Sequence, residues 1–378
     1  MQKFKYNFSM HFQILQNNIF KMLIVFILFN SCGKSVEELE KSNIDVPIIN
    51  YSKDIFVDTE YTFENEGLNA PIIVRENPAK NEIFVLDRGN ISFYVFSKEG
   101  KYLRKFSRAG MGPGEMLSPL YFDLDGNGNI YVYEIGNFRI SILSQEGRFL
   151  NSFRLQYIPQ SLQALTSQFF VSSEGEIIIN LPKRGYYITV FDKQGTIIRE
   201  IGKIPDYLID SPQANVIFSQ GFPFVDEEEK YYIFLESMLL VNIYDKMGNL
   251  IREAKFDEII QDEKYKKLRK KFDPPLKQTD KRIESWISTI NEIIYKNGYF
   301  YLIPFIVGPI KDDTILEINV IDRNLNLVKK LNLPIDEGAN RYGHIFITCE
   351  VLSDNKTILI PLQYSSKIFQ YKEISKNK

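Results

Sequence analysis

Histidine, cysteine and tryptophan are scarce in this chain of 378 residues, which contains 2 His, 2 Cys and 1 Trp. One histidine, His11, stands near the N-terminus, so His344 alone cannot supply a three-histidine zinc site. A Ser-His-Asp triad would also depend on His344, and the chain has no Gly-x-Ser-x-Gly segment of the kind that presents a nucleophilic serine. The composition therefore argues against zinc-dependent and serine-dependent hydrolysis.

A marked excess of charge of either sign is also missing. Lysine and arginine number 46, and aspartate and glutamate number 48, which gives a net charge of −2. Proteins that bind nucleic acid through bulk charge carry a positive excess on the domain. We therefore expect no nucleic-acid partner.

The apolar run at residues 22–29 is too short to cross a membrane, because a helix needs roughly 20 apolar residues for a bilayer core of about 30 Å. Lys3, Lys5 and Lys21 precede this run, and no acidic residue occurs before Glu37. A basic segment followed by a short apolar segment is the layout of a secretory signal. The N-terminus therefore predicts export.

The segment 28–32, Leu-Phe-Asn-Ser-Cys, resembles the end of a bacterial lipoprotein signal. The resemblance implies that residues 1–31 are a signal peptide, that Cys32 is lipidated, and that residues 32–50 are a flexible tether to the outer membrane of the cell envelope. An ordinary cleaved signal with an incidental cysteine is the alternative. The other cysteine, Cys349, would then have no disulfide partner, and its strand-like surroundings favour a buried thiol.

One phrase recurs along the rest of the chain: a strand, a polar turn with glycine, and another strand. Its turn glycines are Gly100, Gly147, Gly195 and Gly248, at intervals of 47, 48 and 53 residues. A fifth copy has Leu325 in the glycine position after a longer interval of 77 residues. A hairpin precedes each copy, so each unit contains four strands.

A four-stranded unit that repeats about every 40 to 50 residues is typical of a propeller blade. The C-terminal residues 355–373 supply two strands, and residues 53–63 supply an unpaired N-terminal strand. Pairing the two ends in one composite blade would remove the open sheet edges. We therefore predict an all-β fold over residues 51–378, a six-bladed β-propeller of four-stranded antiparallel blades, with five blades as the alternative count.

Residues 256–294 interrupt this rhythm, because they are rich in charge and have apolar residues at helical spacing. The predicted helical face consists of Ile283, Trp286, Ile287, Ile290 and Ile294. We expect a short helical insertion, which either packs on the rim of the propeller or forms a lid or partner surface.

Residues 106–153 resemble an NHL repeat, in which a glycine-rich turn, an Asp-x-x-Gly turn, a strand, an acidic residue and a Gly-Asn-x-Arg turn follow one another. The matching residues are Gly110, Gly112, Pro113, Gly114, Pro119, Asp123, Gly126, Ile130, Tyr131, Val132, Glu134, Gly136, Asn137, Arg139 and Gly147. Together with the signal, the chain resembles the six-bladed propeller lipoproteins of Bacteroidetes. The resemblance implies a fold and an envelope location, and leaves the activity open.

The segment 123–134, Asp-Leu-Asp-Gly-Asn-Gly-Asn-Ile-Tyr-Val-Tyr-Glu, also matches the calcium loop of an EF-hand. Its candidate metal ligands are Asp123, Asp125 and Asn127. The residues that follow alternate as in a strand, whereas an EF-hand requires a helix there, and Asp and Asn also favour turns without an ion. We therefore predict a turn between two blade strands and no cofactor, with a calcium ion as the alternative.

Several charged residues are candidates for ligand contacts. Arg108 and Glu115 flank the glycine-rich turn, and Arg88, Arg139 and Arg184 occupy related hairpin turns in three successive units. If these turns line one mouth of the channel, they form a basic patch for an anionic or sugar ligand. Alternatively, each arginine ties adjacent blades together through hydrogen bonds. His344 is a further candidate.

These observations favour a non-catalytic, lipid-anchored propeller that binds a glycan, a peptide or an envelope protein. The alternative is a calcium-dependent lactonase- or lyase-like enzyme with its site in the channel. Carboxylates that converge at the channel mouth would favour the enzyme, whereas a lining of aromatic and arginine side chains would favour binding.

Overall fold

Strands make up most regular elements of the chain, as its aromatic and β-branched composition predicts. The structure is a computed structural model, and the residues that it describes are 46–59, 67–77, 79–155, 169–210, 218–260, 290–304, 306–307, 314–335, 344–345, 348–361 and 366–374. The predicted signal peptide, residues 1–31, and the predicted lipidation site, Cys32, lie outside these residues. None of the described helices is long and apolar enough to cross a membrane.

The first four blades are four-stranded antiparallel sheets in which sequence neighbours pair. The first consists of β2 (Pro71–Asn77), β3 (Glu82–Asp87), β4 (Ser92–Ser97) and β5 (Tyr102–Phe106); the second of β6 (Pro119–Leu124), β7 (Ile130–Glu134), β8 (Arg139–Leu143) and β9 (Phe149–Arg154); the third of β10 (Phe169–Val171), β11 (Ile177–Ile179), β12 (Tyr186–Phe191) and β13 (Ile197–Lys203); and the fourth of β14 (Gly221–Val225), β15 (Tyr231–Leu235), β16 (Leu240–Tyr244) and β17 (Leu250–Lys255).

The fifth and sixth blades are joined in one larger sheet. The fifth consists of β18 (Ile290–Lys296), β19 (Tyr299–Pro304), β21 (Ile315–Asp322) and β22 (Leu327–Pro334), and the sixth of β24 (Glu350–Val351), β25 (Thr357–Pro361), β26 (Lys367–Glu373) and the N-terminal strand β1 (Ile48–Asp58). The prediction of a six-bladed propeller with four-stranded antiparallel blades is confirmed.

Strand β1 closes the ring. It pairs antiparallel with β26 from Tyr51 opposite Glu373 to Asp58 opposite Lys367, so the two ends of the chain share one blade, as predicted. Its first three residues, 48–50, pair in parallel with β22 of the fifth blade. The predicted tether, residues 32–50, therefore extends three residues too far, because residues 48–50 belong to a strand. Their pairing depends on main-chain hydrogen bonds to the edge of β22, which no side-chain pattern in these residues predicts.

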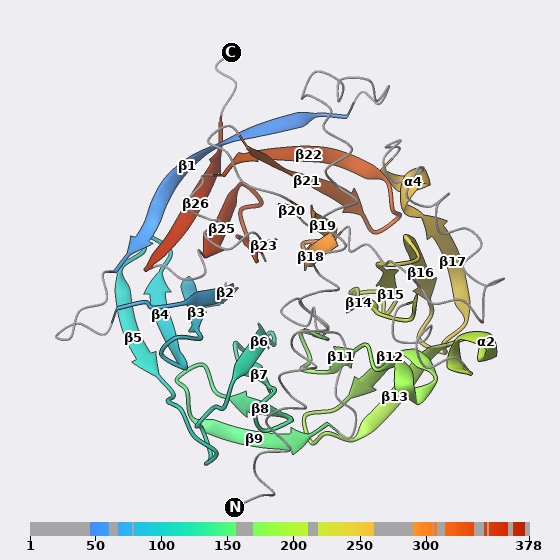
Figure 1. The fold of residues 1–378 in the computed structure, drawn as a ribbon, viewed down its shortest axis with the longest axis horizontal. Helices are drawn as coiled ribbons and strands as arrows, with labels where there is room; N and C mark the ends of the chain where they lie inside the picture. The colour runs from blue at the N-terminus through green and yellow to red at the C-terminus, as the bar shows by residue number, and fades with distance from the viewer. Residues whose placement is uncertain are drawn as a thin grey trace, which may run out of the picture. The chain divides into compact units, whose positions relative to one another are not determined.

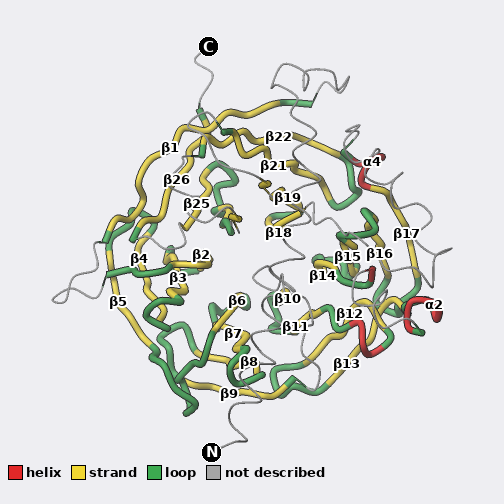
Figure 2. Tube along the Cα trace, viewed as in Figure 1, coloured by secondary structure: helices red, strands yellow, loops and turns green. Residues whose placement is uncertain are grey.

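The blades stand around one central axis, with the first strand of each nearest the centre and the fourth at the periphery (Figure 1; Figure 2). These strands belong to one compact unit, residues 45–280 and 287–378. All residues of β2 and of β14 are buried, so neither strand alternates between a buried and an exposed face.

Neighbouring blades pack through aromatic side chains. Phe93 of the first blade meets Phe122 of the second, edge to face, with ring centroids 4.9 Å apart. Tyr232 of the fourth blade contacts Phe300 of the fifth, also with centroids 4.9 Å apart. Because no blade can bury both of its faces alone, such contacts between blades form the core.

The outer hairpins confirm the predicted glycine turns. Gly100, Gly147, Gly195 and Gly248 have φ between 81° and 85°, the left-handed conformation that glycine adopts without steric cost. Leu325 takes the same conformation with φ 60°, and its side chain is only 3% exposed. Burial of this leucine offsets the backbone cost that a glycine would avoid.

The insertion departs from its prediction at its C-terminal end. Its described part contains the single-turn helix α4 (Phe256–Ile259), and residues 261–289 lie outside the described residues. Ile290 and Ile294, expected on a helical face, belong to the inner strand β18. The error has a simple origin: residues four apart share one face of a strand as well as one face of a helix.

Four short elements complete the description. The 3-10 helix η2 (Pro182–Arg184) joins β11 to β12, and the helix α2 (Asp206–Ile209) follows β13. Two short strands, β20 (Ile306–Val307) and β23 (His344–Ile345), pair with each other as a small separate sheet.

Candidate ligand site at the channel mouth

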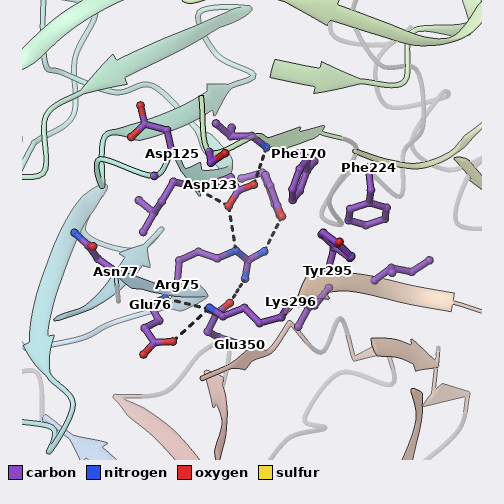
Figure 3. Close-up of a pocket in the computed structure, with 17 residues that line it drawn as sticks. Arg75, Glu76, Asn77, Asp123, Asp125, Phe170, Phe224, Tyr295, Lys296 and Glu350 are labelled. Atoms are coloured by element: carbon purple, nitrogen blue, oxygen red, sulfur yellow. Dashed lines mark hydrogen bonds and ion pairs between the residues drawn. The ribbon is translucent and has the colours of Figure 1, made fainter. Parts of the chain in front are cut away.

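A pocket of about 250 Å³ opens at one mouth of the central channel. The innermost strands of all six blades line it, which places it on the axis of the ring. One residue from each of these strands is Arg75 of β2, Asp123 of β6, Phe170 of β10, Phe224 of β14, Tyr295 of β18 and Glu350 of β24 (Figure 3).

The sequence positions these side chains by ending apolar inner strands with charged or aromatic residues. Strand β2 reads Pro-Ile-Ile-Val-Arg-Glu-Asn, so Arg75 and Glu76 come just before the turn to the second strand. Asp123 and Lys296 stand at the same end of β6 and β18. The turns between the first and second strands therefore surround the charged mouth of the channel.

Arg75 is the centre of the charged wall, and its side chain is almost fully buried, with the residue 7% exposed. It donates to the Tyr121 hydroxyl at 2.6 Å and to Glu292 Oε1 at 3.1 Å, and to two backbone carbonyl oxygens at 2.8 and 3.3 Å. Burial alone would lower the pKa of Arg75, but Tyr121, Glu292 and Glu350 raise it well above its usual value. The guanidinium therefore stays charged.

Lys296 forms the second cationic centre. Its Nζ lies 2.9 Å from Glu350 Oε1 and 3.3 Å from Glu76 Oε2. Lys98 lies 2.6 Å from Glu76 Oε1, which also accepts a hydrogen bond from the Ser353 hydroxyl, and Glu76 Oε2 accepts one from the Ser353 backbone N–H. Although burial would raise the pKa of Glu76, these partners hold it below its usual value.

Asp123 is less tightly paired than these carboxylates. Its Oδ1 lies 3.9 Å from Arg75 Nε, and it accepts hydrogen bonds from the backbone N–H groups of Val171 and Leu124, each at 2.9 Å. Burial raises the pKa of Asp123 to about 6, against the opposing effects of Arg75 and the two N–H donors. The side chain is still 16% exposed, so it remains open to the pocket.

The opposite wall of the pocket is aromatic. The ring centroids of Phe170 and Phe224 lie 5.5 Å apart, and those of Tyr295 lie 6.2 Å from Phe170 and 6.5 Å from Phe224. The Tyr295 hydroxyl donates to Glu227 Oε2 at 2.7 Å, and this hydrogen bond holds the Tyr295 ring beside Phe170 and Phe224. Figure 3 shows the three rings on one side of the pocket and the charged groups on the other.

The candidate residues from the second and third strands occupy the other end of the blades. Arg88 lies in the exposed turn between β3 and β4. Arg139, at the start of β8, pairs with Glu134 at 2.9 Å and donates to the backbone carbonyls of Met111, Gly112 and Glu115. Arg139 therefore holds the glycine-rich loop that leads into its own blade.

The remaining arginines have carboxylate partners nearby in the chain. Arg184 pairs with Glu200 of the same blade at 2.6 Å, and Arg108 pairs with Glu115 across the glycine-rich loop at 2.7 Å. None of the five predicted residues Arg88, Arg108, Glu115, Arg139 and Arg184 lines the described pocket. Their role as ligand contacts stays a prediction. The ion pairs of Arg139 and Arg184 each join two residues of one blade, so these two arginines have structural partners.

His344 lies in β23, where its backbone pairs with Val307. Its side chain is outside the part of the chain that the structure describes. Its proposed ligand contact therefore stays a prediction.

The acidic residues at the ends of the second strands tie the blades to their incoming loops. Asp87 accepts backbone N–H bonds from Asn69, Ala70 and Asn90. Glu134 accepts from the backbone N–H of Leu117, in the loop that leads into β6. The acidic position of the repeat is therefore structural in these two blades.

The calcium-like segment 123–134 forms the end of β6, a turn and the whole of β7, so the predicted turn between strands is confirmed. Asp125 Oδ1 accepts from the backbone N–H groups of Asn127 and Asn129, and Oδ2 accepts from the side chain of Asn129 and the hydroxyl of Tyr131. Lys193 also lies 3.3 Å from Oδ2. The carboxylate of Asp125 thus organises its own turn.

The same aspartate pattern recurs at other turns, where Oδ1 accepts from the backbone N–H groups two and four residues later. These aspartates are Asp192, Asp226, Asp245 and Asp322. Within the described segments, no group of three or more His, Cys, Asp or Glu side chains is arranged to hold a metal ion.

The reasoning from sequence missed most of the pocket. Of its candidates, Asp123 and Asp125 line the pocket, but both were considered as metal ligands. Arg75, Lys296 and Glu350 were not singled out. The available signal was a charged residue near the end of a largely apolar inner strand, which occurs in β2, β6 and β18.

Comparisons with known proteins agree with this architecture. The family described as "6-bladed beta-propeller" matches residues 73–271. A member of the duf4221 family from Bacteroides vulgatus is similar in structure over 86% of this chain and 97% of its own, with 10% identity and a TM-score of 0.50. A protein from Bacteroides fragilis described as exported has 16% identity over 87% of this chain and 100% of its own, with a TM-score of 0.49.

A catalytically inactive virginiamycin B lyase from Staphylococcus aureus is also similar, with 10% identity, coverage of 86% of this chain and 100% of its own, and a TM-score of 0.48. At such identities the likeness concerns the fold alone. No curated protein matches the chain.

Proposed function

Because the chain belongs to the six-bladed β-propeller family, we propose that it is a binding module that holds part of a glycan, a peptide or an envelope protein in the mouth of its central channel. In a propeller the blades surround one axis, so side chains from the inner strands of every blade converge there. The proposal gives the channel mouth the role of the recognition site.

One observation carries this proposal: the innermost strands of all six blades contribute to a single pocket with an aromatic wall and a charged wall. Ligand sites typically combine apolar surface with a few fixed polar groups that orient the ligand. The charged groups are fixed by mutual ion pairs, so little ordering is needed when a ligand binds.

The enzymatic alternative has mixed support. Carboxylates do converge at the mouth, which favours an enzyme, and aromatic side chains with Arg75 line it as well, which favours binding. Glu76, Glu292 and Glu350 each pair with Arg75 or a lysine. Calcium coordination would have to displace these cations. The balance therefore favours binding.

The location forms the second part of the proposal. The signal-like N-terminus and the NHL-like repeat support a lipid-anchored outer-membrane protein of the Bacteroidetes type, with Cys32 as the lipidated residue. Labelling of the expressed protein with a fatty-acid analogue tests the anchor. We expect incorporation into the wild-type protein and none into Cys32→Ala, and equal labelling of both would contradict the assignment.

Binding is tested by screening the purified protein against glycan and peptide arrays, followed by titration calorimetry of the ligands found. Phe170→Ala shortens the aromatic wall, and Phe149→Ala makes the same change on the outer strand β9, where the residue is 38% exposed. We expect at least a roughly tenfold loss of affinity for Phe170→Ala and none for Phe149→Ala. Equal affinities of the two variants, or no bound ligand in the screens, would contradict the proposal.

A further inference from the structure

The charged wall of the channel mouth has one more carboxylate than cationic side chains in its network of described ion pairs. Among the residues that the structure describes, ion pairs connect seven charged side chains into one network, three positive and four negative. They are Arg75, Lys98 and Lys296 on the positive side and Glu76, Asp123, Glu292 and Glu350 on the negative side. A nearby pair, Asp125 with Lys193, is balanced. The network therefore has a formal charge of −1 when every group is ionised.

Asp123 is the carboxylate with the weakest cationic partner in this network. Its distance from Arg75 Nε is 3.9 Å, whereas Glu292 lies 3.1 Å from Arg75 and Glu350 lies 2.9 Å from Lys296. Asp123 also lines the pocket directly. The excess negative charge is thus accessible to a ligand.

The hydrogen-bonding capacity of the charged wall also favours a ligand that donates hydrogen bonds. The four N–H groups on the two terminal nitrogens of Arg75 match four acceptors, and two of the three N–H groups of Lys296 face carboxylates. By contrast, each carboxylate oxygen of Asp123 accepts one hydrogen bond, Oδ1 from the backbone N–H of Leu124 and Oδ2 from that of Val171, and each oxygen has capacity for a second. Asp123 therefore keeps acceptor capacity that a ligand in the pocket can use.

The aromatic wall suits the same kind of ligand. The faces and edges of Phe170, Phe224 and Tyr295 provide apolar surface, and aromatic faces also attract cations. A pocket of about 250 Å³ has room for a group smaller than a typical drug molecule.

We propose that the group which enters the channel mouth is an organic ammonium ion with an apolar or aromatic body, such as an amine or the amino group of a peptide. The ammonium would donate to Asp123 and neutralise the excess charge, and the body would pack on the aromatic wall. This inference rests on the proposed binding function and specifies the ligand class of the same site.

Three probes of similar shape separate the charge from the body of the ligand. They are phenethylamine, which is cationic at neutral pH, 2-phenylethanol, which is neutral, and 3-phenylpropanoate, which is anionic. Calorimetric titration of the full-length protein should show that the amine binds roughly ten- to a hundredfold more tightly than the alcohol, because only the amine makes a charge-assisted hydrogen bond. The carboxylate should bind most weakly.

Asp123→Asn provides the matched test of position. We expect this variant to lose the preference for the amine and to keep its affinity for the alcohol. An unchanged affinity for the alcohol also shows that the aromatic wall is intact. Glu174→Gln, an exposed carboxylate change outside the pocket, should leave all three affinities unchanged.

The outcomes distinguish the two levels of the proposal. The ammonium inference would be overturned if the alcohol or the carboxylate bound as tightly as the amine. The binding function would still hold if Phe170→Ala weakened this binding. No binding of the amine at millimolar concentration would also overturn the inference. The binding function itself fails if the glycan and peptide screens are empty as well.

Discussion

At the scale of single residues, the channel mouth is held together by buried charges. Removing two charges from water costs several kcal/mol per ion, and only close partners offset that cost. Arg75 and Lys296 have such partners, at 3.1 and 2.9 Å. Asp123 does not, and burial raises the pKa of its carboxyl.

The pKa of Asp123 makes stability depend on pH. Burial raises it from 3.8 to about 6, so between these values the folded protein binds a proton more tightly than the unfolded chain. Wild-type stability should therefore fall as the pH rises from about 4 to 6, relative to Asp123→Asn, which cannot ionise. The change reaches at most about 3 kcal/mol, because one pKa unit corresponds to about 1.36 kcal/mol.

Urea denaturation of both proteins across this pH range measures the effect. The free energy of unfolding of Asp123→Asn minus that of wild type should increase with pH and level off above pH 6. A constant difference, or one that decreases with pH, would show that Asp123 does not titrate in this window. Glu174→Gln serves as the exposed control.

The outer turns give a second test at this scale. Gly100 and Gly248 have nearly equal φ values of 85° and 84°, so alanine should cost each turn about 1 kcal/mol through backbone strain. An alanine Cβ at position 100 would lie 2.4 Å from the Phe56 carbonyl oxygen, whereas at position 248 the nearest atom is 3.9 Å away. Gly100→Ala should therefore be the more destabilising variant in chemical denaturation, and equal effects would refute the predicted contact.

At the scale of elements, β1 decides whether the ring closes. It covers the edge of β26 along most of its length and bridges to β22. Exposed strand edges favour association with other chains, so covering them protects the fold.

Truncation tests this role. A protein that begins at residue 46 keeps β1 and should retain the wild-type melting temperature of the propeller, whereas one that begins at residue 60 lacks it. We expect the shorter protein to unfold at a clearly lower temperature and to aggregate, as measured by differential scanning calorimetry and light scattering. Similar melting of the two proteins would mean that β1 is dispensable.

The calcium-like turn between β6 and β7 supports another prediction. Asp125 is engaged by donors of its own turn, by Tyr131 and by Lys193, so calcium would have to displace them. The melting temperature should therefore be the same in excess calcium and in excess chelator. A rise with calcium would instead support the hydrolytic alternative.

At the scale of the whole molecule, repetition made the fold predictable. Each turn glycine predicted an outer hairpin, and the unpaired strands at the two ends predicted closure. Ile290 and Ile294 were misassigned because their spacing fits a strand and a helix equally well. The strand at residues 48–50 was missed because its pairing depends on the edge of a distant strand.

The candidate site was much less predictable, because its members are remote in sequence. Arg75 and Glu350 interact at 3.6 Å although 275 positions separate them. The repeat predicts where strands lie, but the register of each strand decides which charged residue faces the axis. Of the arginines singled out from the sequence, Arg88, Arg139 and Arg184 lie instead at turns between second and third strands, and Arg108 lies in the loop between the first two blades.

The channel mouth is proposed to bind a cationic ligand between its two walls. A crystal structure of the protein with phenethylamine tests it most directly. We predict the amine nitrogen within hydrogen-bonding distance of the Asp123 carboxylate and the phenyl ring against Phe170, Phe224 and Tyr295. Amine density at another surface, or a ring inserted among the charged groups with its nitrogen directed away from Asp123, would contradict the account.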